Sequence, residues 1–205
     1  MKNTIHLTTH SGKMDGIRSI STNPLTNQFC NRMHDCGNDR VICTHCYATR
    51  LVDFRLSLQK HVENNSVALS ERVIPMNELP SYNDELIRFD SFGELINETH
   101  LINFFNLCYK NPQTYHVLYT KRCNLVEDMA HLKPSNLKVV ESNPIVDSVY
   151  EKPKSPIADI VFNVVTPEYL EQNPRYKATC IKACNTCRLC YSRRTPMKFI
   201  VELLK

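Results

Sequence analysis

Glycine is scarce in this sequence, and tryptophan is absent. Only four of the 205 residues are glycines, namely Gly12, Gly16, Gly37 and Gly93. They form neither a GxGxxG nor a GxxxxGK[ST] motif, the two common glycine-rich loops that cradle phosphate groups. Nucleotide binding through such a loop is therefore excluded.

Long apolar runs are missing as well. No stretch reaches the roughly 20 residues that a membrane-spanning helix needs, and the first residues, MKNTIHLTTHSGKMDG, lack the apolar centre of a signal peptide. The net charge of +4 permits contact with nucleic acid but does not require it. We therefore expect a cytoplasmic protein without a membrane partner.

Cysteine, by contrast, is abundant. The chain has ten cysteines, although structural disulfides are rare in a reducing cytosol. Cys108 and Cys123 stand alone, and we expect both to be small buried hydrophobic residues. The other eight form a first group (Cys30, Cys36, Cys43 and Cys46) and a second group (Cys180, Cys184, Cys187 and Cys190).

The second group lies within eleven residues, 180-CIKACNTCRLC-190. Zinc sites usually combine two cysteine pairs from segments separated by roughly a dozen residues or more. The spacing here is the reverse of the bacterial ferredoxin run, which holds [4Fe–4S] clusters and whose fourth cysteine serves a second cluster. We therefore predict an iron–sulfur cluster, with zinc as the alternative. The assignment of Cys180 to one cluster or the other stays open.

The first group contains the stretch 36-CGNDRVICTHCYA-48. Three thiolates, from Cys36, Cys43 and Cys46, would leave one iron of a four-iron cluster free to bind a small molecule. A fourth thiolate from Cys30 would close the site and favour a structural or redox role. His34 and His45 are alternative ligands, or hydrogen-bond donors to sulfur.

The remaining pattern alternates between strands and helices, which indicates parallel strands with right-handed crossovers. The chain is short for a complete eight-unit barrel, so we predict a partial (β/α) barrel or an open, mostly parallel sheet. We expect one domain over residues 1–205, with a cysteine loop at 30–46, an α/β core at 47–170, and a cysteine loop at 180–190 before a final strand. The expected strands are 16–20, 86–91, 115–121, 137–142, 157–165 and 197–204, and the expected helices lie within 47–73, at 98–110 with Asn97 as N-cap, and at 124–133.

Function in such folds collects at the carboxyl ends of the strands. This rule selects a set of polar side chains that either line a pocket or form ion pairs at the end of the sheet. They are Asp90, Ser91, Gly93, Glu94, Lys121, Arg122, Glu141, Ser142 and Asn163.

The cysteine pattern C-x6-C-x2-C-Y-A resembles the signature of phage-encoded radical-SAM-like proteins. With Cys30 and the C-terminal cysteine run, the chain is similar to the phage gene-product-eighty-eight family. The segments RFDSFGELINETHLINFF and YHVLYTKR also resemble that group. The resemblance implies a partial barrel with a [4Fe–4S] cluster on Cys36, Cys43 and Cys46, in the host cytoplasm if the chain is phage-encoded.

The resemblance also implies a place for S-adenosylmethionine (SAM). In radical SAM enzymes the methionine end of SAM chelates the free iron, and a glycine-glycine-glutamate-proline stretch binds its amino group. Ser91, Gly93 and Glu94 stand at that stretch here, and only Gly93 and Glu94 agree with it. The spacing of six residues between the first two cysteines also departs from the usual three.

Three functions follow from these observations. The first is an iron–sulfur protein with a radical-SAM-like fold, one or two [4Fe–4S] clusters and a small-molecule substrate. The second is an electron-transfer protein with closed clusters and an electron-donor partner. The third is a zinc-stabilised module that binds nucleic acid. We also expect the two ends of the chain to lie close together, because strands 16–20 and 197–204 could join one sheet, and to bring both cysteine groups to the same end of it.

Overall fold

The protein is described here by a computed structural model that covers residues 4–204. Its centre is an open sheet of six parallel strands, arranged in chain order from one edge to the other. This confirms the predicted α/β fold with a parallel sheet. The strands are β1 (Arg18–Ile20), β2 (Leu86–Phe89), β3 (Tyr115–Thr120), β4 (Leu137–Ser142), β5 (Ile160–Val165) and β6 (Phe199–Leu203).

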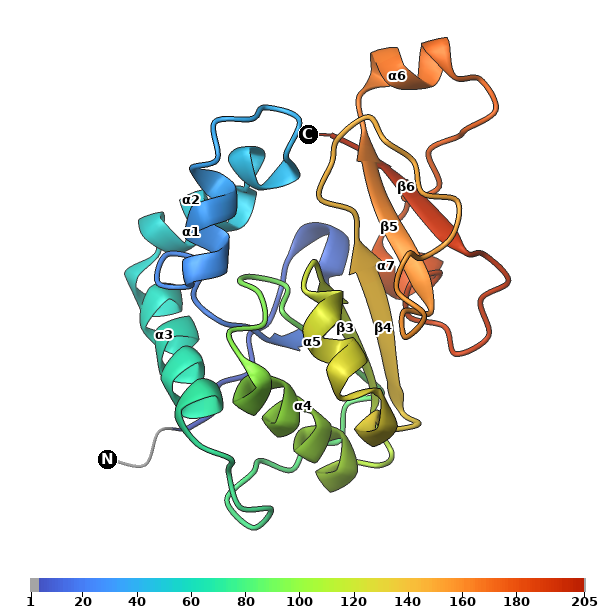
Figure 1. Ribbon diagram of the computed structural model, residues 1–205. Coiled ribbons are helices and arrows are strands. Elements are labelled where there is room, and N and C mark those ends of the chain that lie inside the picture. The colour runs from blue at the N-terminus through green and yellow to red at the C-terminus, as the bar shows by residue number, and fades with distance from the viewer. Residues whose placement is uncertain (1–3, 205) are drawn as a thin grey trace.

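The helices lie in the crossovers between these strands (Figure 1). Right-handed crossovers in a sheet of sequential order place their helices on the same face. Accordingly, α3, α4 and α5 cover one face of the sheet. The helices are α1 (Gln28–His34), α2 (Tyr47–Phe54), α3 (Leu56–Glu71), α4 (Glu98–Lys110), α5 (Cys123–Asp128), α6 (Pro167–Gln172) and α7 (Cys184–Cys187), with short 3-10 helices η1 (Gly12–Met14), η2 (Ile42–His45) and η3 (Ala130–Leu132).

Helix α4 shows how the sequence specifies an element. The side chain of Asn97 accepts a hydrogen bond from the backbone N–H of His100 and so caps the first turn. Leu101, Phe104 and Cys108 repeat at helical spacing and are fully buried. These residues share the side of the helix that contacts the sheet. The helix begins and ends at the predicted residues, 98 and 110.

The face beneath these helices forms the larger apolar core. Ile87 and Phe89 of β2 pair in register with His116 and Leu118 of β3, and all four are fully buried. The ring of Phe89 stacks on Phe104 of α4 with centroids 4.0 Å apart. Strand β2 is thereby fixed between its neighbours and the helix layer.

The opposite face carries the residues that alternate with these. We call it the cysteine face, because residues 180–191 pack on it together with η1. Its buried strand residues include Val117, Tyr119, Val140 and Ile200. The C-terminal cysteine segment therefore belongs to a second, smaller core and is not a surface appendage.

Each edge of the sheet is paired with the chain segment next to it. At β1, Ser19 exchanges backbone hydrogen bonds with Thr8 at 2.8 and 2.9 Å. At β6, the carbonyl of Val201 accepts from the N–H groups of Thr179 and Cys180. In the part of the chain that the structure describes, no helix is long and apolar enough to cross a membrane.

Candidate metal centre

The first cysteine group lies at the carboxyl ends of the strands, between β1 and β2 in the chain (Figure 1). Cys30 is in α1, which the side chain of Asn27 caps by accepting from the N–H groups of Phe29 and Cys30. Cys43 is in η2, and Cys46 is the capping residue between η2 and α2. Helix α1 packs against η2, so residues far apart in the loop come together.

Three of these four thiols share one environment. Cys30 interacts electrostatically with Cys43 and Cys46, and burial raises the pKa of Cys30 and of Cys43. Cys36 is exposed and interacts electrostatically with Cys43. The structure therefore brings together Cys30, Cys43 and Cys46, whereas the sequence pattern favoured Cys36 as the third member.

A lysine faces this group. Lys121, directly after β3, interacts electrostatically with Cys43, Glu94, Cys46 and Cys30. Burial alone would lower the pKa of Lys121, yet these neighbours raise it. The ammonium is consequently charged and offsets negative charge on the thiols around it.

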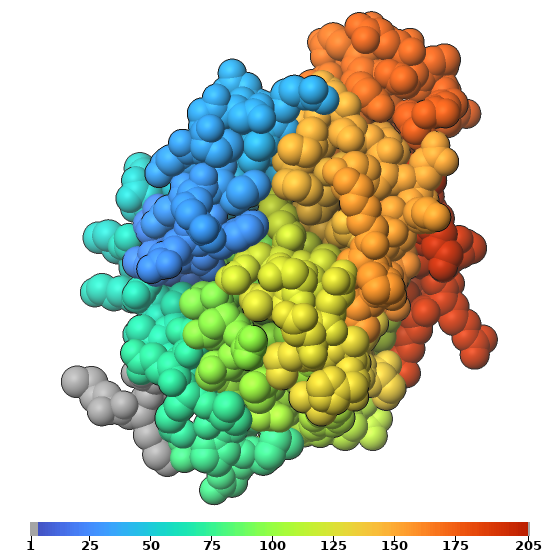
Figure 2. Space-filling view, viewed as in Figure 1, coloured from blue at the N-terminus to red at the C-terminus, as the bar shows by residue number. Residues whose placement is uncertain are grey.

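Backbone hydrogen bonds tether the loop that carries Cys43 to the segment that follows β4. The N–H of Ile42 donates to the carbonyl of Pro144 at 2.8 Å, and the N–H of Val146 donates to the carbonyl of Arg40 at 2.7 Å. In Figure 2 the blue surface of this loop meets the gold surface of the segment after β4. The loop thus reaches from the β1 side to the β4 side of the sheet.

The two histidines near the first group point to other partners. His34 pairs with the carboxylate of Asp35, and His45 contacts the carbonyl of Asp39 at 2.9 Å. Both histidines are exposed. Neither ring is therefore directed to the cysteine thiols. Cys108 and Cys123 are buried, as predicted.

The second cysteine group runs along the cysteine face. Cys180 interacts electrostatically with Cys184, and Cys190 interacts with both. Burial raises the pKa of all three thiols, that of Cys190 to about 12. Cys187 is half-buried on α7. The prediction that both groups share one end of the sheet is only partly met, because Cys190 packs deeper, beside Tyr119 and Lys138.

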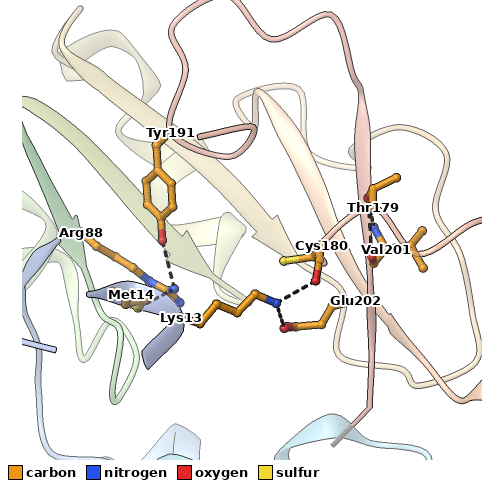
Figure 3. A network of polar contacts seen from close by, with 8 residues as sticks. All are labelled: Lys13, Met14, Arg88, Thr179, Cys180, Tyr191, Val201 and Glu202. Atoms are coloured by element: carbon orange, nitrogen blue, oxygen red, sulfur yellow. Dashed lines mark hydrogen bonds and ion pairs between the residues drawn. The ribbon is translucent and has the colours of Figure 1, made fainter. Parts of the chain in front are cut away.

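Arg88 lies on the same face and was not selected from the sequence. Its guanidinium is 3.8 Å from the ring centroid of Tyr119, and one of its amino groups contacts Met14 and Tyr191 at 3.4 Å. Figure 3 shows Arg88 beside η1, where Lys13 also bonds the Cys180 carbonyl and the Glu202 carboxylate. An arginine in the strand LIRF was the available signal, because alternation places it opposite the apolar residues.

The three residues predicted for SAM are engaged by the fold. Glu94 accepts from the Thr120 hydroxyl at 2.5 Å and from the backbone N–H groups of Leu95 and Lys121. Gly93 has a φ of +77°, and a Cβ there would lie 2.5 Å from the Thr22 carbonyl oxygen. The Ser91 hydroxyl bonds those of Ser19 and Ser21. These residues therefore do not fit a role in holding SAM.

Other polar groups at the strand ends also hold the backbone. Arg122 donates to the carbonyls of Leu95 and Ile96, and Glu141 accepts from two N–H groups of the β4–β5 loop. Asn163 links Tyr150 to the neighbouring strand β6. Asp90 differs from these, because one of its carboxylate oxygens is buried without a partner among the described residues. Burial and Glu94 raise the pKa of Asp90.

A hydroxyl cluster lies beside Arg88, and of its three serines only Ser91 was selected from the sequence. Ser19, Ser21 and Ser91 bond one another at 2.8 to 3.0 Å, and His10 contacts the Ser19 hydroxyl at 2.7 Å. Burial, with a smaller effect of Arg88, lowers the pKa of His10 to about 4. The ring is therefore neutral at neutral pH. All three serines are fully or nearly fully buried, so the cluster joins β1 to β2 and does not face solvent.

Within residues 4–204, no three cysteine, histidine or acidic side chains are arranged to bind one metal ion. All ten cysteines are free. Thiolates are ligands of both zinc and iron–sulfur clusters.

No family model, curated protein or solved structure matches this chain. The resemblance to phage radical-SAM-like proteins therefore stays a prediction from the cysteine motifs. What the structure itself provides is the α/β fold and the positions of the two groups.

Proposed function

We propose that the protein binds iron–sulfur clusters through both cysteine groups and acts in electron transfer. The observation that carries this proposal is that three thiols of each group share an environment that contains basic side chains. Cys30, Cys43 and Cys46 face Lys121, and the second triad faces Arg88 through Cys184 and Cys190. Positive charge near cysteine favours the thiolate, which is the form that binds metal.

When bound, a [4Fe–4S] cluster supplies one-electron redox chemistry. The chain would bind each cluster through its cysteines and shield it from solvent. Cys30, Cys43 and Cys46 would hold one cluster, with Cys36 near enough to Cys43 to complete the set. Cys180, Cys184 and Cys190 would hold the other, with Cys187 completing it. Each electron would come from an external reduced partner and leave to an oxidised one.

The chemistry of SAM is not part of this proposal. Its predicted residues, Ser91, Gly93 and Glu94, already bond or contact the neighbouring strand ends. If Glu94 turned away to bind SAM, the Thr120 hydroxyl and the Lys121 N–H would lose their acceptor. Each buried donor left unpaired costs about 1–3 kcal/mol of stability. The radical-SAM-like fold can therefore serve cluster binding without SAM at these positions.

The test begins with anaerobically purified protein, in which iron, sulfide and zinc are measured. We expect about eight irons per chain, since each [4Fe–4S] cluster contains four. Cys43→Ser and Cys190→Ser should each lose about half of the iron, and each should remove a different EPR signal from the dithionite-reduced sample. Cys108→Ser is the matched control outside both groups and should keep all of it.

Three outcomes would contradict the proposal. Zinc without iron would favour the zinc-stabilised nucleic-acid module instead. Iron with an EPR signal that changes on addition of SAM would mean that a cluster has a free iron and that the protein is an enzyme. Loss of nearly all of the iron from each single variant would mean that the two groups build one shared centre.

A further inference from the structure

Arg88 occupies an unusual position for a charged residue. It lies in β2, the strand next to the edge strand β1, on the side that packs against Tyr119 and Tyr191. It forms no ion pair with any carboxylate of residues 4–204. Its Nε is buried without a hydrogen-bond partner in the same part of the chain. Removing a cation from water without a paired anion is unfavourable.

The groups around Arg88 compensate this cost only in part. The face of Tyr119 attracts the guanidinium through a cation–π contact. The contacts to the Met14 sulfur and the Tyr191 hydroxyl, both at 3.4 Å, use the same amino group. Asp90 also interacts electrostatically with Arg88, but burial raises the pKa of Asp90 and so favours its neutral form. Cys184 and Cys190, which pack in the same cluster as Met14, Tyr119 and Tyr191, also interact with Arg88 and can become negative when metal binds.

We infer that Arg88 is the fixed counter-charge of the metal centre held by the second group, an inference that rests on the proposed function. Metal binding converts Cys184 and Cys190 to thiolates and places negative charge beside the guanidinium. The arginine then stabilises the more negative, reduced state of that centre relative to the oxidised state. Arg88, which forms no ion pair with a described carboxylate, is thus a positioning residue that tunes the reduction potential of the centre. It is not a ligand of the centre.

The first group offers the internal comparison. Its cation, Lys121, comes from a different strand and interacts with Cys43, Cys46 and Cys30. No described interaction joins Lys121 to a cysteine of the second group. Lys13 also interacts with Cys180 and Cys184 of the second group, but it forms an ion pair with Glu202, whereas Arg88 forms none among the described residues. Removal of Arg88 should therefore affect the second centre, and removal of Lys121 the first.

The experiment is a redox titration, followed by EPR, of anaerobically purified Arg88→Met and Lys121→Met proteins. The signals are assigned by the Cys43→Ser and Cys190→Ser variants. In Arg88→Met, the ratio of reduced to oxidised second centre at fixed potential should fall about tenfold, which is 59 mV for one electron. The first centre should not change. Lys121→Met should give the reverse pattern, and Arg88→Lys should keep most of the wild-type ratio.

Folding is controlled by circular dichroism of each variant. If Arg88→Met does not fold, Arg88→Gln takes its place, because it removes the charge but keeps a donor for Tyr191. Loss of the second signal alone from a folded, uncharged variant also supports the inference, provided that Arg88→Lys retains it. Both signals at wild-type potential in Arg88→Met would overturn the inference and leave the proposed function intact. Absence of iron from the wild-type protein would overturn the proposed function first.

Discussion

The two cysteine groups differ in how the fold holds them. The first is built from a short helix and a 3-10 turn on the strand ends, with an exposed Cys36 and a tether to the β4–β5 loop. The second packs into a core, where Cys190 and Tyr191 are buried against the sheet. A group of four cysteines can therefore lie in a surface loop or within a structural layer of the same fold. Truncation of a side chain in the second group should therefore lower the stability more than truncation of its counterpart in the first group.

The largest expected difference comes from the tyrosine that follows each group. Tyr191 is 6% exposed and Tyr47 is 57% exposed. We expect Tyr191→Ala to lower the free energy of unfolding by about 3–5 kcal/mol, as large aromatic truncations in cores do. Tyr47→Ala should cost about 1 kcal/mol or less. Urea unfolding of the metal-free proteins measures both, and equal losses would contradict the comparison.

Acid should affect the cysteine face through His10, whose pKa burial lowers to about 4 from 6.5. A group whose folded pKa is depressed contributes stability that is present above pH 6.5 and lost as the pH falls to about 4. The free energy of unfolding of His10→Gln should therefore fall by roughly 1–2 kcal/mol less than that of the wild type between pH 6.5 and 4. This range allows for solvent screening of a half-buried ring. His100 and His116, whose burial lowers their pKa to about 3 and about 4, should account for part of the rest.

The measurement is the free energy of unfolding in urea at several pH values between 7 and 4. His45→Gln in the first group is the matched control, because its ring is exposed. It should leave the slope close to that of the wild type. A His10→Gln protein with the full wild-type slope would mean that the cysteine face does not respond to acid through this ring.

The smallest effect on global stability should come from releasing the tether of the first group. Ile42→Pro removes the N–H that donates to Pro144. Proline is tolerated here because Ile42 is the first residue of η2 and Val41 before it is extended. We expect a loss of about 1 kcal/mol or less. Alkylation of Cys43 and Cys46 in the metal-free protein should become faster.

The control is the second cysteine group in the same sample. Alkylation of Cys184 and Cys190 should keep its wild-type rate, as mass spectrometry of the labelled peptides can show. Faster labelling of both groups would indicate that the tether stabilises the whole sheet. In that case the first group would be as integral to the fold as the second.

Much of the fold could be predicted because its signals are local. Strand β4 and helix α4 have the predicted bounds, since a run of buried β-formers and a capped apolar stripe define them. Helix α1 was missed because QFCNRMH has no buried residue and therefore no apolar period. Asn27, which caps it, was the only local signal.

The site was less predictable, because its members are joined by long-range packing. Spacing grouped the cysteines correctly, but spacing alone favoured Cys36 over Cys30 in the first triad. Only the packing of α1 on η2 brings Cys30 to Cys43. The position of Arg88 depends on which face of β2 the C-terminal segment covers. That information lies about 100 residues further along the chain.

The pairing of the sheet edges has a consequence for solubility. An unpaired edge strand offers free N–H and C=O groups to a second chain and promotes association. Here Thr8 covers Ser19 of β1, while Thr179 and Cys180 cover Val201 of β6, each through backbone groups. The segment that presents a thiol of the second group therefore also shields the sheet from aggregation. Because that shield uses the backbone, it persists when the thiol of Cys180 is replaced.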